Sequence, residues 1–276
     1  MFFKKIVWGI QKSSSKSLDI SKLKNKNFTV ILGFARSGTS LLGGLLNKAG
    51  FYFGEDKDMK KSDFRNPQGF FENDFIFDLS RKFIRESGFE NELPDPSKNL
   101  KAKGGLNRIK RFFTRIKIQK ILFSLASKSD NISFKNFPIF FYFWKPYLPE
   151  HKVIGIYRDP FSVVESFMKA WPAGRFTAEQ VINYWTLANK DVLYHLASAG
   201  KNGILIKYED LFDSSKQNEL LHKIISFLGK GNFEELKQVL NPNLNRSSKN
   251  TSSFREIYPL NEEAKDILIA LDKIKI

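Results

Sequence analysis

The most constraining feature of the sequence is a glycine-containing loop between an apolar run and a helical pattern. Residues 28–32 form a buried-strand pattern, and residues 40–49 have apolar positions at helical spacing before Gly50. The loop between them is Gly33-Phe34-Ala35-Arg36-Ser37-Gly38-Thr39-Ser40. At the start of a helix, free backbone N–H groups and the positive end of the helix dipole favour an anion. The sequence therefore predicts a strand, loop and helix unit that binds a phosphate-like group.

Further strand and helix patterns alternate along the chain. Apolar, β-rich runs predict strands at 152–157 and 203–208, and helical spacing predicts helices at 161–170, 178–198 and 216–228. Alternation of this kind is typical of an α/β domain with a central, mainly parallel sheet flanked by helices. We expect one such domain over residues 28–276.

Two segments differ from this pattern. Residues 1–27 become rich in Ser, Lys and Asn after a short apolar start, which predicts a mobile basic leader. Residues 91–131 carry Lys and Arg between apolar positions and predict a basic helical insertion. This insertion has three interpretations: a lid over the substrate, an amphipathic helix on an anionic membrane, or a solvated charged face.

Composition excludes several classes of site. The chain has no cysteine, so thiolate catalysis, disulfides and iron–sulfur clusters are excluded, and nothing requires an oxidising compartment. Its three histidines, His151, His195 and His222, are too far apart to suggest a metal cluster. No apolar run reaches the roughly 18 residues of a spanning helix. We expect a cytoplasmic protein, with peripheral membrane contact through the basic segments as an open alternative.

The net charge and the residues of the loop limit the range of possible partners. The net charge of +16 favours an anionic partner without choosing among kinds. A phosphate-binding NTPase loop has the pattern G-x-x-x-x-G-K-[ST], but here Thr39 replaces the lysine, which disfavours ATP or GTP hydrolysis. A P-loop kinase or other nucleotide phosphotransferase with a degenerate loop remains one alternative. A non-catalytic protein that binds an anionic polymer or membrane is another, although no motif for reading nucleic acid is visible.

Several motifs resemble those of the sulfotransferases that use 3′-phosphoadenosine-5′-phosphosulfate (PAPS). Residues 35–41, ARSGTSL, resemble their loop P-[RK]-S-G-T-[ST]-[LW], with Ala35 in place of the proline. Arg158, which follows a predicted strand, and Ser166, eight residues on, resemble the pair that holds the 3′-phosphate of PAPS. Segments 66–72, 207–211 and 241–246 are similar to segments of bacterial members. The resemblance covers most of residues 28–253, but neither the leader nor the insertion.

The resemblance implies a P-loop-containing fold and transfer of a sulfuryl group from PAPS to a hydroxyl or amine. The acceptor stays open among sugars (as in a glycan), lipids, peptides and small metabolites, and no metal is required. The implied donor-binding residues are Arg36, Ser37, Gly38, Thr39, Ser40, Arg158, Ser166, Tyr208, which could stack on adenine, and Arg246.

The catalytic groups are assigned in the same way. Arg36 and Lys135 are expected to stabilise negative charge on the bridging oxygen; the alternative for Lys135 is a solvated residue in a Phe-rich turn. Cytosolic members have a histidine base where this chain has Phe137, so that mechanism does not carry over. Glu72 is the expected general base, or else a carboxylate at a helix N-terminus. The runners-up for the base are Glu55 and Asp56, and Trp171 or Trp185 is expected to line the acceptor pocket.

Overall fold

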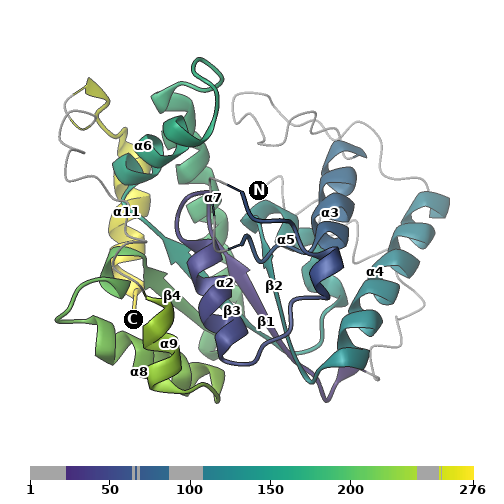
Figure 1. The fold of residues 1–276 in the computed structure, drawn as a ribbon. Coiled ribbons are helices and arrows are strands. Elements are labelled where there is room, and N and C mark those ends of the chain that lie inside the picture. Colours follow the sequence, from purple (N-terminus) through teal and green to yellow (C-terminus); the bar gives the residue numbers. More distant parts are fainter. Residues whose placement is uncertain (1–22, 64–65, 67–68, 87–107, 241–254, 256) are drawn as a thin grey trace.

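A four-stranded parallel sheet forms the centre of the protein (Figure 1). The computed structural model describes residues 23–63, 66, 69–86, 108–240, 255 and 257–276. The strands lie in the order β2-β1-β3-β4, and every neighbouring pair is parallel. Their bounds are β1 Asn27–Leu32, β2 Asn131–Asn136, β3 His151–Tyr157 and β4 Gly203–Lys207.

Helices connect the strands and cover both faces of the sheet. The helices of the described residues are α2 Thr39–Lys48, α3 Asp74–Glu86, α4 Arg108–Lys128, α5 Pro138–Trp144, α6 Pro160–Ala170, α7 Ala178–Ala199, α8 Gln217–Leu228, α9 Phe233–Val239 and α11 Glu262–Ile274. Short 3-10 turns lie at η2 Asp56–Asp58, η3 Lys145–Tyr147, η4 Gly200–Asn202 and η5 Glu209–Leu211.

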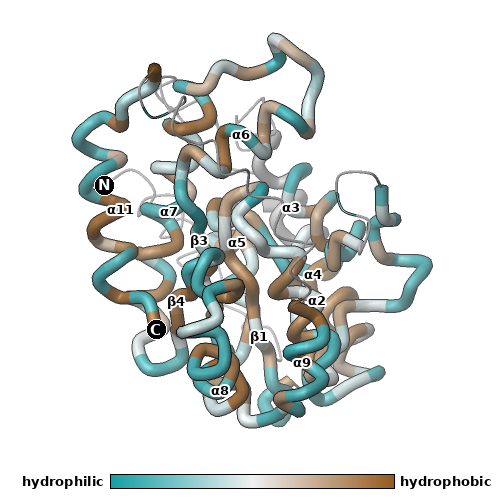
Figure 2. Tube along the Cα trace, turned by 60° about the vertical axis from the view of Figure 1, so that its left-hand side comes forward, coloured by the Kyte–Doolittle hydropathy of each residue, from teal (hydrophilic) through white to brown (hydrophobic). Residues whose placement is uncertain are grey.

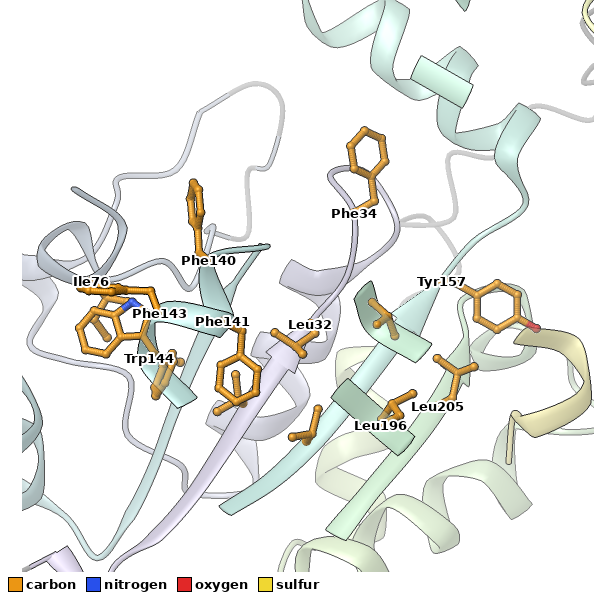
Figure 3. Packing of buried hydrophobic residues seen from close by; sticks show 14 of the residues in the cluster. Leu32, Phe34, Ile76, Phe140, Phe141, Phe143, Trp144, Tyr157, Leu196 and Leu205 are labelled. Atoms are coloured by element: carbon orange, nitrogen blue, oxygen red, sulfur yellow. The ribbon is translucent and has the colours of Figure 1, made fainter. Parts of the chain in front are cut away.

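Strands β1 and β3 carry apolar residues on both sides, as expected of a sheet whose two faces are both covered. In β3, Ile154 and Ile156 face a core built with α2, α8 and α9, whereas Val153 and Tyr157 face a larger core that includes α5 and α7. Figure 2 shows β1 as hydrophobic over most of its length, while the helices alternate between hydrophobic and hydrophilic turns. The larger core is strongly aromatic: side chains of α5, among them Trp144, pack beside Ile76 of α3 (Figure 3).

The strands and helices expected from the sequence are all present, within one or two residues of the expected bounds. Strand β2 was not expected. Its sequence NISFKN carries polar residues at alternate positions, which is compatible with a solvent-exposed turn. In the structure, however, Ser133 and Asn136 are buried. The Ser133 hydroxyl donates to the carbonyl of Thr29 at 2.8 Å, which satisfies one of these polar groups inside the sheet.

The end of the expected leader contributes to the core, and residues 1–22 lie outside the described residues. Leu23 is buried in the larger core, and the backbone N–H of Asn27 donates to the carbonyl of Asp130 at 2.8 Å. Helix α4, within the expected basic insertion, also contributes to this core through Ile118, Leu122 and Leu125. The described part of the insertion is therefore packed against the domain, and its role as a lid stays a prediction.

The parallel arrangement decides where functional groups can meet. Because all four strands run the same way, the residues that follow them lie at one edge of the sheet. The loop 33–38 follows β1, Lys135 and Asn136 end β2, Arg158 follows β3 and Tyr208 follows β4. Four segments that are far apart in the sequence therefore meet at the carboxyl edge.

Candidate active site

The loop after β1 ends at a helix N-terminus whose N-cap residue has no side chain. Gly38 is the N-cap residue of α2, so it offers no side-chain cap to the first helical N–H groups, and the first turn of α2 has no acidic residue. The hydroxyl of Ser37 is buried and has no hydrogen-bond partner among the described residues. An uncapped helix start beside an unsatisfied hydroxyl is chemically suited to an anion.

Close contacts leave no room for a side chain at two glycines of this loop. A Cβ at Gly33 would lie 2.6 Å from the carbonyl oxygen of Ile156, and a Cβ at Gly38 would lie 2.3 Å from Cδ2 of Tyr208. Gly38 also has φ +96°, a region that residues with a side chain rarely adopt. Arg36 has φ 68° despite its side chain, and such strain is concentrated at functional sites.

The two predicted arginines lie side by side at the sheet edge. The Nε of Arg36 donates to the hydroxyl of Ser166 at 3.0 Å, and Nη1 of Arg158 donates to the carbonyl of Arg36 at 3.2 Å. The guanidinium of Arg158 also lies over the ring of Tyr208, 4.5 Å from its centroid. Four predicted donor-site residues, Arg36, Arg158, Ser166 and Tyr208, are thus brought together in space. Tyr208 is 6% exposed, so stacking on adenine stays a prediction.

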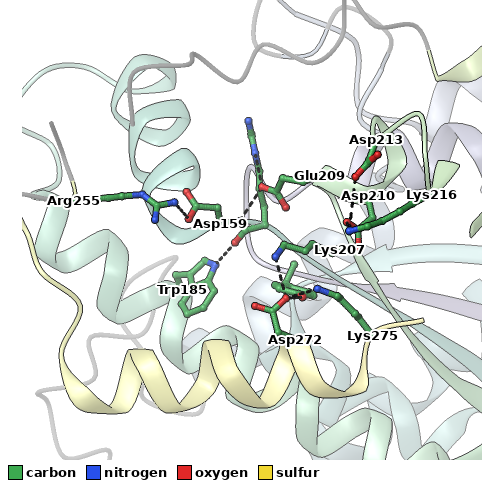
Figure 4. Close-up of polar contacts among 12 residues, drawn as sticks. Asp159, Trp185, Lys207, Glu209, Asp210, Asp213, Lys216, Arg255, Asp272 and Lys275 are labelled. Atoms are coloured by element: carbon green, nitrogen blue, oxygen red, sulfur yellow. Dashed lines mark hydrogen bonds and ion pairs between the residues drawn. The ribbon is translucent and has the colours of Figure 1, made fainter. Parts of the chain in front are cut away.

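Two residues hold Arg158 and its turn in place, in a role that the sequence did not indicate (Figure 4). The indole N–H of Trp185 donates to the carbonyl of Arg158 at 3.0 Å. Glu209 accepts from the backbone N–H of Asp159 at 3.0 Å and lies 4.0 Å from Nε of Arg158. Burial raises the pKa of Glu209, and the hydrogen bond from the backbone N–H of Asp159 and the charge of Arg158 oppose this only in part. Glu209 lies in the segment 207–211 compared above, but nothing in a single sequence shows that it faces Arg158.

The expectation that Trp185 lines the acceptor pocket is wrong. Trp185 has no exposed surface, because its ring is part of the larger core and its N–H is used by Arg158. Trp171 is half-buried and stacks on Phe167, with ring centroids 4.0 Å apart, so its predicted role stays open.

The second catalytic group predicted from the sequence, Lys135, is buried rather than solvated. Its ammonium donates to the hydroxyl of Ser40 at 3.0 Å and lies 2.8 Å from Oε1 of Glu72. Oε2 of Glu72 lies 2.8 Å from the ammonium of Lys60, a residue that the sequence analysis did not single out. Lys60 belongs to an exposed-looking charged run, so its sequence context gives no signal of this contact.

The charges of this cluster affect one another. Burial by itself raises the pKa of Glu72, but the ammonium groups of Lys135 and Lys60 outweigh burial and lower it below its ordinary value. Burial lowers the pKa of Lys135, and Glu72 opposes that change. Glu72 is therefore a carboxylate at neutral pH, with one lysine on each oxygen.

Glu72 is held in place by the segment before it. Helix α2 contains Gly43 and Gly44, and Phe71 packs on them so closely that a Cβ at Gly43 would lie 2.7 Å from Cβ of Phe71. Phe71 itself has φ 52°, which turns the chain toward the cluster. Glu72 precedes α3, whose first turn is capped by Asn73 through a hydrogen bond from the N–H of Ile76. Glu72 thus lies outside the helix, and its side chain is free of the capping role.

The remaining candidates are elsewhere. Glu55 is on the surface, ion-paired with Lys57 at 2.7 Å and Lys128 at 3.2 Å, and Asp56 is exposed in η2. Arg246 lies outside the described residues. Among the described residues, no three His, Asp or Glu side chains are grouped as a metal site would need. None of the described helices combines the length and apolar character that crossing a membrane requires.

Comparisons with known proteins bear on the fold and on the family of this chain. The chain is similar in structure to the sulfotransferase domain of the curacin biosynthetic pathway, with a TM-score of 0.52 and 17% identity over 90% of this chain and 98% of that one. It is also similar to the sulfotransferase STF1 from Mycobacterium tuberculosis H37Rv, with a TM-score of 0.51 and 14% identity over 91% of this chain and 81% of that one.

The sulfotransferase domain of the Synechococcus PCC 7002 olefin synthase gives a TM-score of 0.50 and 16% identity over 89% of this chain and 94% of that one. At such identities the likeness shows the fold alone, a P-loop-type α/β fold. No curated protein matches the sequence. The model of the sulfotransferase family, however, matches residues 29–235, well over half of the chain. The chain therefore belongs to the sulfotransferase family.

Proposed function

We propose that this sulfotransferase takes its sulfuryl group from PAPS and transfers it to a hydroxyl or amine of an acceptor. The observation that carries the proposal is the meeting of the uncapped N-terminus of α2 with Arg36, Arg158 and Lys135 at one edge of the sheet. A donor with a phosphate at each end of its ribose needs cations in two places. The loop after β1 and the turn after β3 supply them.

The residues fit the two ends of such a donor. Ser37, Gly38, Thr39 and Ser40 would hold the 5′ end through backbone N–H groups and hydroxyls, since the N–H groups at the start of α2 have no side-chain cap. Arg158 and Ser166 would hold the 3′-phosphate, with Arg246 as a further predicted cation. The ring of Tyr208, next to Arg158, would contact the adenine.

PAPS supplies an activated sulfuryl group bonded to a phosphate that can leave. Arg36 and Lys135 would stabilise the negative charge that grows on the bridging oxygen in the transition state, and preorganised cations do this at little reorganisation cost. Glu72, a carboxylate next to Lys135, would accept the proton of the acceptor.

A binding experiment tests the donor. Adenosine 3′,5′-bisphosphate should raise the melting temperature of the protein without magnesium, while ATP with magnesium should have little effect. Stabilisation by ATP and magnesium alone would instead favour the nucleotide phosphotransferase alternative. Tight binding to anionic vesicles or polymers with no response to the bisphosphate would favour a non-catalytic protein.

The acceptor is a separate question, because fold does not fix substrate. Sugars, lipids, peptides and small metabolites are all compatible with the proposal. Incubation with radiolabelled PAPS and a cell lysate or glycan panel, followed by identification of the labelled product, would find it. A cytoplasmic location, with or without peripheral membrane contact, is part of the proposal and is tested by cell fractionation.

A further inference from the structure

The carboxylate of Glu72 has two ammonium partners of unequal exposure. Lys135 lies 2.8 Å from Oε1, and its side chain is 7% exposed; Lys60 lies 2.8 Å from Oε2, and its side chain is 36% exposed. Lys135 also donates to Ser40 in the loop, whereas Lys60 lies on the other side of the carboxylate. Among the described residues, Lys135 and not Lys60 bonds to the segment that is proposed to bind the donor, so the two lysines cannot have the same task.

Lys60 is held rigidly for a surface lysine. Its backbone N–H donates to the carbonyl of Glu72 at 2.9 Å, and the next pair of residues, Met59 and Asn73, forms an antiparallel bridge. Its ammonium lies 4.4 Å from the ring centroid of Phe70 and 5.5 Å from that of Phe77. Backbone pairing and two aromatic rings thus fix Lys60 against Glu72, and cation–π contacts add to the ion pair.

We propose that Lys60 is the positioning residue for Glu72. Lys60 keeps its ion pair with Oε2 when Lys135 leaves Oε1 to contact the donor. Oε1 can then accept the proton of the acceptor. This inference rests on the proposed function.

The reason is one of charge. Lys135 is already placed between Glu72 and the loop, and an anionic sulfonate or phosphate there would compete with Glu72 for its ammonium. If Lys135 were the sole partner of Glu72, binding of the donor would leave Glu72 as a nearly buried carboxylate with no counter-charge. Burial would then drive Glu72 to take up a proton before the reaction. Lys60 keeps it ionised and oriented.

The transfer step balances with Glu72 as the base. The acceptor oxygen forms a bond to sulfur, and the bond from sulfur to the bridging oxygen of the donor breaks. The electron pair of that bond stays on the bridging oxygen, beside Arg36 and Lys135. The acceptor proton goes to Oε1 of Glu72. Lys60 exchanges no proton in this step.

The pKa of Glu72 reports this arrangement. The charged groups around Glu72 are Lys60 on its own segment, Lys135 on β2 and Asp74 at the start of α3, and the charge of Arg36 acts on Lys135. Loss of the Lys60 charge removes one of the two interactions that keep this carboxylate ionised, so the pKa of Glu72 must rise. The pKa of Glu72 should be highest when the Lys60 charge is absent and an anion in the loop also occupies Lys135.

The test follows the carboxyl carbon of Glu72 by NMR in protein labelled at glutamate, with the signal assigned from Glu72→Gln. Lys60→Met removes the charge but keeps the aliphatic stem, Lys60→Arg restores the charge, and Lys61→Met is the matched control at the exposed neighbouring position. With adenosine 3′,5′-bisphosphate bound, we expect Lys60→Met to raise the titration midpoint of Glu72 by roughly one pH unit or more, a tenfold change in its proton affinity.

Lys60→Arg should return the midpoint to the wild-type value, and Lys61→Met should leave it unchanged. The dissociation constant of the bisphosphate should change less than about twofold in all three variants, since Lys60 does not contact the loop. Lys60→Gln serves as a second neutral variant and should behave as Lys60→Met does, so the test does not depend on one substitution folding well.

The outcomes separate the two proposals. An unchanged Glu72 midpoint in folded Lys60→Met and Lys60→Gln, with normal bisphosphate binding, would overturn the role of Lys60 and leave the donor site standing. If Lys60→Arg did not restore the titration midpoint of Glu72, this result would also overturn the proposed role of Lys60. Absence of bisphosphate binding by the wild-type protein would remove the proposed function, and the role of Lys60 with it.

Discussion

Gly38→Ala tests whether the loop is shaped by its contact with Tyr208. The new Cβ would lie 2.3 Å from Cδ2 of Tyr208, and the residue would keep φ +96°. The left-handed backbone costs about 1–2 kcal/mol once a Cβ is present. Overpacking against a buried ring costs about 1–3 kcal/mol more. The free energy of unfolding should therefore fall by about 2–5 kcal/mol.

A second glycine separates these two costs. Gly69 has the same φ of +96°, but a Cβ there would meet nothing within 4 Å. Gly69→Ala should cost only the backbone part, about 1–2 kcal/mol. In a domain of this size, each kcal/mol shifts the melting temperature by about 2–4 °C. We expect a fall of roughly 4–20 °C for Gly38→Ala and roughly 2–8 °C for Gly69→Ala.

Urea denaturation and thermal melts of both variants provide the measurement, and Tyr208→Ala completes a double-mutant cycle with Gly38→Ala. Removing the ring should recover about 1–3 kcal/mol of the loss at residue 38, because the two sites are in contact. Equal losses for the two glycine variants, or no coupling to Tyr208, would refute the packing argument.

Three further predictions concern the donor site, the Glu72 segment and the C-terminal helix. Arg158→Lys keeps the charge but loses the planar contact with Tyr208 and should weaken bisphosphate binding by about tenfold in calorimetry; an unchanged affinity would place the 3′-phosphate elsewhere. Gly43→Ala should cost about 1–3 kcal/mol by overpacking against Phe71. Gly44→Ala, whose Cβ has no neighbour closer than 3.4 Å, should be neutral or stabilising by up to about 1 kcal/mol in the same melts. Burial raises the pKa of Asp272, but hydrogen bonds from Lys275, Tyr157 and Lys207 (Figure 4) outweigh it and lower the pKa to about 2. Since the folded-state pKa is below the ordinary value, this stabilisation is present above about pH 4 and lost as the pH falls toward 2. Asp272→Asn should therefore cost about 1 kcal/mol at pH 7, after allowance for solvent screening, and progressively less as the pH falls toward and through 2, as measured by urea denaturation at each pH. A loss that does not depend on pH would contradict this sign.

The sequence alone predicted most of the local structure, including the loop between the first strand and the first helix. The strand before Gly33, the helix after Gly38 and the strand before Arg158 are set by apolar periodicity and by glycine and proline, which act over a few neighbouring residues. For this reason their positions were predicted to within one or two residues. The same local signals failed for β2, where Ser133, Lys135 and Asn136 are polar residues buried by their neighbours in the sheet.

Only the tertiary structure decided which groups meet. Lys60 and Lys135 are 75 positions apart in the sequence, yet both lie 2.8 Å from Glu72. Trp185 was one of two tryptophans expected at an acceptor pocket, since an aromatic residue gives no local sign of what covers it, but the fold buries it under Arg158. Periodicity reports the side of an element that faces the core. Contacts between charged side chains depend on how distant elements pack, and this information is not contained in any single segment of the sequence.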